Sequence, residues 1–166
     1  IGYANPAICN FMAQYLNKDS AILIAGCGNA YEAEFLVQNG FTNITLIDIA
    51  ETAVKNLQEK FKEVDSITIL CEDYFAHTAR YDILIEQTFF CAINPKQRTE
   101  YAQKAHSLLN QNGILTGVLF NREFEKAGPP FGGTKDEYQR YFQPYFEFKI
   151  FENCRSSIPE RQGSEL

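Results

Sequence analysis

The sequence places a glycine-containing turn directly after its first strongly apolar run. Residues 21–25 read Ala-Ile-Leu-Ile-Ala and continue into Gly26, Cys27 and Gly28. Glycines at a strand-to-helix turn allow a sharp bend and a close approach of a ligand to the backbone. The N–H groups exposed there suit a carboxylate or a phosphate. A tight turn alone also needs a glycine, so this motif by itself leaves a purely structural role open.

The second apolar run ends in an acidic residue, Asp48. A carboxylate at this position can accept hydrogen bonds from both hydroxyls of a ribose, so the two features together predict a nucleoside cofactor. The dinucleotide fingerprint needs glycine or alanine at position 31, where this chain has Tyr31. The methyltransferase form of the turn, Gly-x-Gly-x-Gly, is matched except that Ala30 takes its last position. The pattern therefore favours S-adenosylmethionine, with a nicotinamide cofactor as the weaker alternative.

Two further acidic residues come after the third and fourth apolar runs. Asp73 is suited to the amino group of an adenine, with the aromatic Tyr74 beside the ring. Glu86 is expected to face the ammonium group of the cofactor. A solvated acidic loop and a surface charge are the alternatives for these two carboxylates. The candidate cofactor-binding residues are Ala25, Gly26, Cys27, Gly28, Asp48, Ile49, Asp73, Tyr74 and Glu86.

Short apolar runs that alternate with amphipathic segments carry these residues. Because the runs are continuous, they indicate strands covered on both faces. Asn5 before Pro6 is typical of a helix N-cap followed by proline at the first helical position. The alternation predicts a three-layer αβα Rossmann-like sandwich with a mostly parallel sheet. The predicted strands are 21–24, 44–47, 67–70, 81–85 and 114–120, and the helices after the first are 32–38, 51–61, 96–109 and 135–142.

Composition narrows the class of protein. The 166 residues suffice for one domain, spanning 1–166, and a formal charge of -6 makes a nucleic acid or an anionic membrane a poor partner. The five cysteines form no Cys-x-x-Cys pair, so neither a zinc site nor a disulfide framework is expected. We therefore predict that the protein binds no metal and is located in the reducing cytoplasm. No apolar run approaches the roughly 18 residues that span a bilayer.

Four stretches resemble one family. The chain is similar to class I S-adenosylmethionine-dependent methyltransferases, and within them to the thiopurine S-methyltransferase-like family, which includes thiol and halide methyltransferases. The resemblance spans nearly the whole chain. It implies the class I methyltransferase fold. We expect the last antiparallel strand of that fold to be missing from this chain, and the chain to be cut short at its amino end. The stretches are Gly-Cys-Gly at 26–28, Ala-Ile-Asn-Pro at 92–95, Gly-Pro-Pro-Phe at 128–131 and the tail 157–163.

The resemblance also implies a substrate pocket formed by the segments after the fourth and fifth strands. Phe89, Phe90 and Phe131 are expected to form its apolar wall, although core packing explains each of them equally well. Tyr3 is expected to cover the pocket as a lid, and Arg161 to lie at its mouth. Thiopurine methyltransferases carry an arginine where this chain has Gln87, also a pocket candidate, which puts that substrate class in doubt.

The sulfonium donor is already activated, so the enzyme chiefly positions the nucleophile and excludes water. A thiol is partly ionised at neutral pH and needs no dedicated base. We therefore expect His77 and His106 to be surface or capping residues, and Cys27 to be a packing residue.

The predicted activity is S-adenosylmethionine-dependent methyl transfer to a small molecule at sulfur or halide, giving S-adenosylhomocysteine. The alternative is a non-catalytic cofactor-binding or scaffolding domain. We expect a monomer or weak homodimer; the acceptor stays open.

Overall fold

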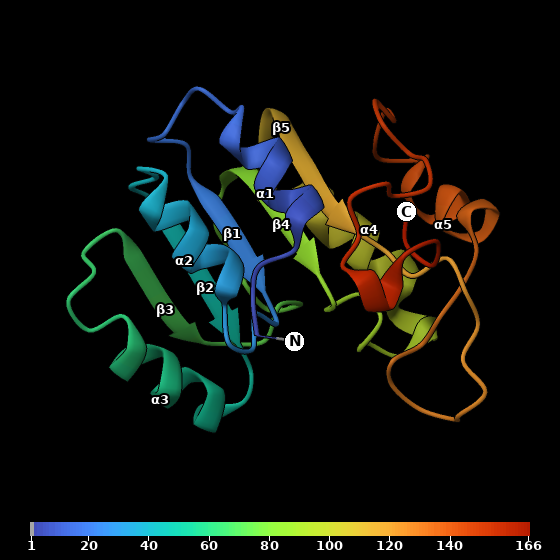
Figure 1. Ribbon diagram of the computed structural model, residues 1–166, viewed down its shortest axis with the longest axis horizontal. Helices are drawn as coiled ribbons and strands as arrows, with labels where there is room; N and C mark the ends of the chain where they lie inside the picture. Colours follow the sequence, from blue (N-terminus) through green and yellow to red (C-terminus); the bar gives the residue numbers. More distant parts are fainter. Residues whose placement is uncertain (1) are drawn as a thin grey trace.

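The computed structural model describes residues 2–166, and its centre is a five-stranded sheet in which every neighbouring pair is parallel. The strand order is β3-β2-β1-β4-β5 (Figure 1). Because β1 lies between β2 and β4, the chain reverses its direction of travel across the sheet at β1, which is where α/β sheets bind ligands. The strands are β1 (Ile22–Ala25), β2 (Ile44–Asp48), β3 (Ile67–Cys71), β4 (Tyr81–Gln87) and β5 (Leu109–Val118).

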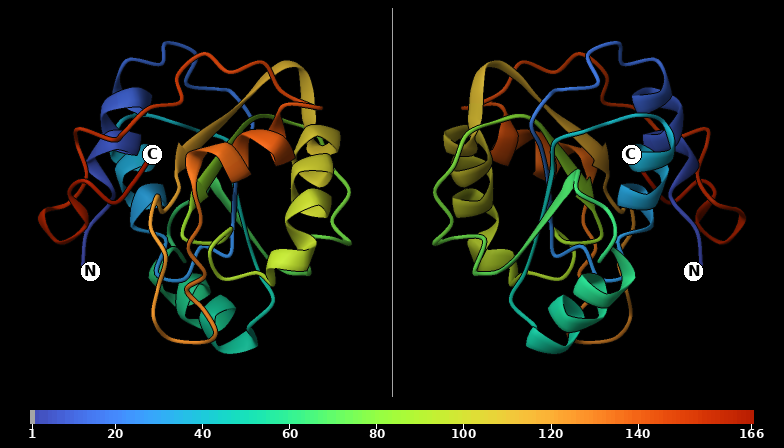
Figure 2. Two further views of the ribbon diagram at one scale, coloured as in Figure 1. Left: turned by 90° about the vertical axis from the view of Figure 1, so that its right-hand side faces the viewer. Right: turned by 90° about the vertical axis from the view of Figure 1, so that its left-hand side faces the viewer.

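Helices cover both faces of this sheet, as Figure 2 shows from two sides. The apolar side chains of α1 and α2 pack in one buried cluster, and those of α4 and α5 pack in the other. The three-layer α/β architecture predicted from the alternating runs is therefore confirmed. The helices are α1 (Pro6–Ala13), α2 (Tyr31–Gln38), α3 (Glu51–Lys60), α4 (Arg98–Leu108) and α5 (Lys135–Phe142), with short 3-10 turns η1 (Pro95–Gln97) and η2 (Pro159–Arg161).

Strand β1 shows why its apolar run is continuous. Ile22 and Ile24 join the buried cluster beneath α1 and α2, whereas Leu23 and Ala25 join the cluster beneath α4 and α5. Successive side chains of a strand point to opposite faces, so a strand covered on both sides has no polar position. Burying each large aliphatic side chain contributes about 2 kcal/mol. The strand is thereby held rigidly where it delivers the glycine turn.

The carboxyl-terminal part differs in detail from the sequence expectation. Strand β5 begins at Leu109, directly after α4, and not at residue 114, because Leu109 pairs with Tyr81 across an irregularity in the ladder. Beyond β5, Leu119 and Leu166 exchange two backbone hydrogen bonds of 3.1 and 2.8 Å. This antiparallel contact places residues 164–166 beside residues 119–121. Between residues 2 and 166, no helix has the length and apolar character to cross a membrane.

Candidate functional site

The turn after β1 has an unusual backbone. Gly26, Gly28 and Ala30 have φ values of 56°, 51° and 50°, in the left-handed region that glycine adopts without strain. The Gly26 N–H donates to the Ile47 carbonyl at 2.8 Å, which fixes the turn to β2. A Cβ placed on Gly28 would meet no atom within 4 Å, so the space above this glycine is open. The turn thus offers bare backbone to a ligand.

The structure brings Asp48 to this turn. Its Oδ2 accepts a hydrogen bond from the Gly28 N–H at 3.3 Å, and its Oδ1 accepts from the Ala50 N–H at 2.9 Å. Each carboxylate oxygen has a second lone pair, so both can still accept from a ligand hydroxyl. The Lys60 ammonium group of α3 also donates to the carbonyl of Asn29 in the turn, and this hydrogen bond stabilises the turn.

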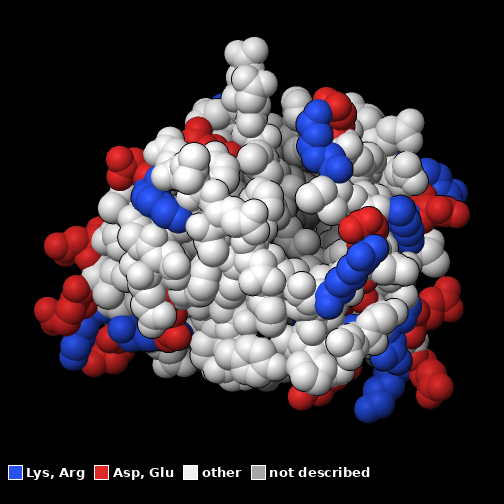
Figure 3. Space-filling model, turned by 45° about the horizontal axis from the view of Figure 1, so that its top comes forward, with Lys and Arg blue, Asp and Glu red and all other residues white. Residues whose placement is uncertain are grey.

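An open cleft with a volume of about 220 Å³ lies in front of the turn. Six residues predicted for the cofactor and substrate sites line it together: Tyr3, Gly26, Cys27, Gly28, Gln87 and Arg161. Tyr3 is 50% exposed at its edge, and its role as a lid stays a prediction. The surface in Figure 3 is hollowed near its centre, and its charged side chains lie mostly around the margin.

Residues near the ends of β2 and β3 lie outside the walls of this cleft. Asp73 is exposed, and its Oδ1 accepts from the Phe75 N–H at 3.0 Å. Ile49 is 71% exposed although it is aliphatic. Ala25, by contrast, is buried at the end of β1. The adenine contact expected for Asp73 and the cofactor contact expected for Ile49 therefore stay predictions.

Glu86, at the end of β4, is placed differently from the expectation. Its Oε1 accepts from the N–H groups of Phe89 and Phe90 at 2.9 and 2.8 Å, and its Oε2 accepts from the Tyr101 hydroxyl at 2.6 Å. Complete burial raises the pKa of this carboxyl to about 7, although the three donors act in the opposite direction. Glu86 does not line the cleft but borders a smaller recess next to it, and its expected contact with a cofactor ammonium group stays a prediction.

The predicted aromatic residues separate into two groups. Tyr74 and Phe90 are core residues: each packs on Tyr101, with ring centroids 5.1 Å away. Tyr74 therefore faces the core, and the adenine contact expected of it stays a prediction. Phe89 lies over the glycine turn, because a Cβ on Gly26 would come within 2.3 Å of its ring. Phe131 lines neither the cleft nor the smaller recess beside it.

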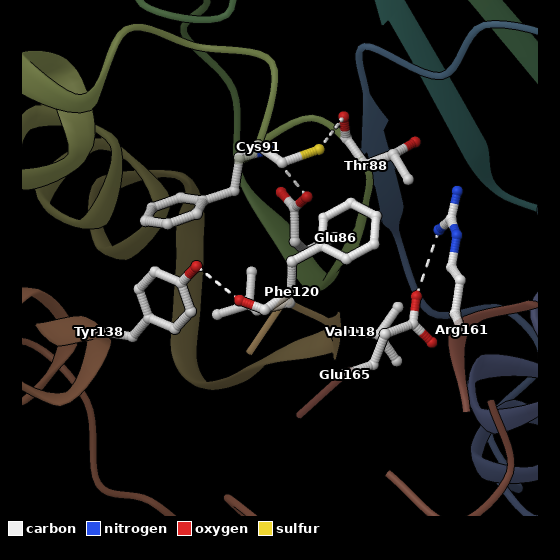
Figure 4. Close-up of a pocket in the computed structure, with 10 residues that line it drawn as sticks. Glu86, Thr88, Cys91, Val118, Phe120, Tyr138, Arg161 and Glu165 are labelled. Atoms are coloured by element: carbon white, nitrogen blue, oxygen red, sulfur yellow. Dashed lines mark hydrogen bonds and ion pairs between the residues drawn. The ribbon is translucent and has the colours of Figure 1, made fainter. Parts of the chain in front are cut away.

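This smaller recess adjoins the cleft (Figure 4). Thr88 and Arg161 line both spaces, and Tyr138 stands on the opposite side of the recess from Arg161 in Figure 4. The Arg161 Nη1 donates to the buried Glu165 Oε1 at 3.2 Å. Burial raises the pKa of the Cys91 thiol in this recess to about 12, so it stays protonated at neutral pH.

The two histidines have different environments. His106 is exposed on α4, as predicted. His77 is 3% exposed, so the expectation of a surface or capping residue is wrong. Its Nδ1 lies 2.9 Å from Glu72 Oε2 and its Nε2 lies 2.8 Å from the Tyr81 hydroxyl. The loop between β3 and β4 folds back and buries the ring, and no local pattern in its sequence indicates this.

Cys27 packs against the cluster beneath α1 and α2, as predicted. Burial, with the nearby Asp48 carboxylate, raises the pKa of its thiol to about 12. It is therefore not a nucleophile at neutral pH. Within residues 2–166, no three His, Cys, Asp or Glu side chains gather so as to hold a metal ion.

Two of the cleft residues that the sequence does not predict as site residues are polar and buried. Asn5 and Glu32 are 1% and 6% exposed, and the Asn5 N–H donates to Glu32 Oε1 at 2.9 Å. Asn5 is identifiable in the sequence only as a helix cap, whereas Glu32 falls in a helix whose burial no local pattern indicates. Asn5 Nδ2 and Gln87 Oε1 are both buried and have no hydrogen-bond partner within residues 2–166. Unpaired buried polar atoms are costly, so their presence in the cleft fits a polar ligand such as S-adenosylmethionine.

Comparison with known proteins tests the resemblance. A family model described as thiopurine S-methyltransferase matches residues 2–165. A probable thiol methyltransferase 2 of Arabidopsis thaliana is 26% identical and covers 99% of this chain, which spans 75% of that protein. A thiopurine S-methyltransferase of Vibrio campbellii is 30% identical over 85% of this chain and 73% of its own length.

Solved structures agree on the fold. The 1,6-didemethyltoxoflavin-N1-methyltransferase of Burkholderia thailandensis, with S-adenosylhomocysteine bound, has a TM-score of 0.75 at 16% identity, covering 97% of this chain and 75% of that one. The magnesium protoporphyrin IX methyltransferase of Synechocystis, also with S-adenosylhomocysteine, has a TM-score of 0.73 at 16% identity, covering 84% and 69%. With the family model matching nearly every residue, this protein is a methyltransferase that belongs to the thiopurine S-methyltransferase family.

Proposed function

We propose that this protein binds S-adenosylmethionine in the cleft and transfers its methyl group to the sulfur of a small thiol or hydrosulfide. The observation that carries the proposal is the open, left-handed Gly26–Gly28 turn with Asp48 hydrogen-bonded to it. Its family membership and the S-adenosylhomocysteine bound in two structural neighbours support the same cofactor. The relatives named for thiol and thiopurine substrates favour sulfur as the acceptor atom.

Each part of the cofactor has a candidate partner on this chain. The two oxygens of Asp48 retain free lone pairs for the ribose hydroxyls. The backbone of the glycine turn would lie against the middle of the cofactor, because no side chain covers Gly28. Asp73 and the exposed Ile49, beside the end of β2, are the proposed contacts for the adenine.

When bound, S-adenosylmethionine supplies a methyl group that its sulfonium charge already activates. The protein's own contribution is then to orient an acceptor and to exclude water. Thr88 and Arg161 lie where the cleft meets the recess, so we propose that the acceptor binds between them. The guanidinium of Arg161 favours an anionic nucleophile such as a thiolate over its neutral form.

Two measurements test this proposal. Calorimetric titration with S-adenosylhomocysteine should show one site per chain, and the absence of heat with folded protein would refute the cofactor assignment. Production of S-adenosylhomocysteine should then be measured with hydrosulfide, small thiols, iodide, thiocyanate and thiopurines. We expect turnover with the small sulfur nucleophiles; binding of S-adenosylhomocysteine without turnover of any acceptor would favour the non-catalytic alternative.

Two further proposals concern the cellular compartment and the oligomeric state of the protein. All five cysteines are free, which agrees with the reducing cytoplasm proposed from the sequence. The proposed monomer or weak homodimer is tested by sedimentation at several protein concentrations. A stable dimer at micromolar concentration would contradict it.

A further inference from the structure

The side chain of Asn5 has one polar atom in use and one without a partner. Asn5 precedes α1, and its Oδ1 accepts from the Ala7 N–H at 2.9 Å, as an N-cap does. Its Nδ2 is buried and lacks a hydrogen-bond partner within residues 2–166. The residue is 1% exposed, yet it lines the cleft beside the glycine turn. A buried donor left unpaired is unfavourable, and a ligand acceptor that pairs with it removes this cost.

The cap fixes which atom of the amide is free. If the amide were turned over, its NH₂ group would face the Ala7 N–H, and two donors would oppose each other. Oδ1 must therefore stay on the helix, and Nδ2 is left as the free donor. The backbone N–H of Asn5 is held as well, because it donates to Glu32 Oε1 at 2.9 Å. The donor is thus anchored at two points, and a ligand that pairs with it must bring an acceptor.

The groups around this donor indicate what kind of acceptor it meets. Gln87 contributes a buried acceptor, Oε1, that has no partner among residues 2–166 to the same cleft, and Glu32 contributes a buried carboxylate. These two groups suit a positive ammonium group. Asn5 Nδ2, at the amino end of an eight-residue helix, suits a negative group. A zwitterion with one ammonium and one carboxylate matches this arrangement, whereas a phosphate would meet one donor and a repelling carboxylate.

We infer that Asn5 Nδ2 donates to the α-carboxylate of the methionine part of the cofactor, with Gln87 Oε1 accepting from its α-ammonium group. The inference rests on the proposed function, because it assumes that S-adenosylmethionine occupies the cleft. It makes Asn5 both a helix cap and a cofactor-binding residue. Gln87, expected from the sequence in the substrate pocket, would then serve the cofactor.

The experiment compares two ligands on two variants. Asn5→Asp keeps an oxygen for the cap but loses the donor, and Asn5→Ser also keeps the cap without adding a charge beside Glu32. S-Adenosylhomocysteine carries the carboxylate, and 5′-methylthioadenosine lacks the whole amino-acid part. Asn94→Asp is the matched control, because Asn94 caps η1 before a proline in the same way but lies outside the cleft.

We expect both Asn5 variants to weaken S-adenosylhomocysteine about 10- to 100-fold, the range for losing a hydrogen bond to a charged group. Their affinity for 5′-methylthioadenosine should change less than about threefold, and Asn94→Asp should change neither. Equal losses with both ligands, or no loss with either, would overturn the inference while leaving the cofactor assignment intact. If the unaltered protein fails to bind S-adenosylhomocysteine, the proposed function itself is refuted.

Discussion

The buried carboxyl of Glu86 predicts how the stability of this enzyme depends on pH. Glu86 is completely buried among Phe89, Phe90 and Tyr101, and its pKa is about 7 in the folded chain against 4.5 for an ordinary glutamate. Between these two values the folded protein holds a proton that the unfolded chain releases. Stability from this group is therefore fully present below pH 4.5 and is lost as the pH rises through 7.

The size of the effect is set by the same two values. One pKa unit corresponds to about 1.4 kcal/mol, so the change between pH 4.5 and values above 7 amounts to about 3 kcal/mol. Glu86→Gln removes the titration. An amide oxygen can still accept from Phe89 and Phe90, and the amide NH₂ can donate to the Tyr101 hydroxyl, as a protonated carboxyl would.

Urea unfolding at pH 5, 6, 7 and 8 tests this reasoning. The free energy of unfolding of Glu86→Gln minus that of the unaltered protein should rise by about 2.5 kcal/mol from pH 5 to pH 8. Glu100→Gln, on the exposed side of α4, is the control and should show no such rise. A difference that stays constant across this range would mean that the carboxyl is ionised in the folded protein, and the argument from burial would be wrong.

Three further changes probe the site. Gly26→Ala forces a side chain into a left-handed turn and against the ring of Phe89, so urea unfolding should show a loss of about 2 kcal/mol or more. Asp48→Ala should weaken S-adenosylhomocysteine binding at least about tenfold by calorimetry, because two proposed ribose contacts are lost. Arg161→Lys keeps the charge beside Glu165, so KM for an anionic acceptor should rise several-fold in steady-state kinetics while S-adenosylhomocysteine affinity stays unchanged.

The sequence predicts the elements of this fold well because their signal is local. All five predicted strands overlap observed ones, since a strand buried on both faces must be apolar throughout. The start of β5 is not predictable in this way, because residues 109–113 contain Asn110, Gln111 and Asn112, which are typical of a turn. Their pairing with β4 depends on Leu109 meeting Tyr81, a contact between segments far apart in the chain.

The glycine turn and the position of Asp48 beside it are predictable for the same reason. A left-handed turn requires glycine at Gly26 and Gly28, and Asp48 ends a strand that lies next to β1 in any sheet of this order. Side-chain direction is not predictable. Tyr74 comes after its strand as an adenine contact would, yet it faces Tyr101, which lies 27 residues further along the chain.

Glu86 is a second residue whose position in the chain was predictable but whose side-chain contacts were not. Its position at the end of β4 predicts a ligand contact, but its three hydrogen bonds instead fix the backbone of Phe89 and Phe90 and the ring of Tyr101. Thr88, just before the two phenylalanines, has a φ of 62°, a conformation that a β-branched residue adopts only when its surroundings impose it. Because Thr88 borders both the cleft and the recess, Glu86 shapes the border between these two spaces through the backbone of Phe89 and Phe90, which it holds.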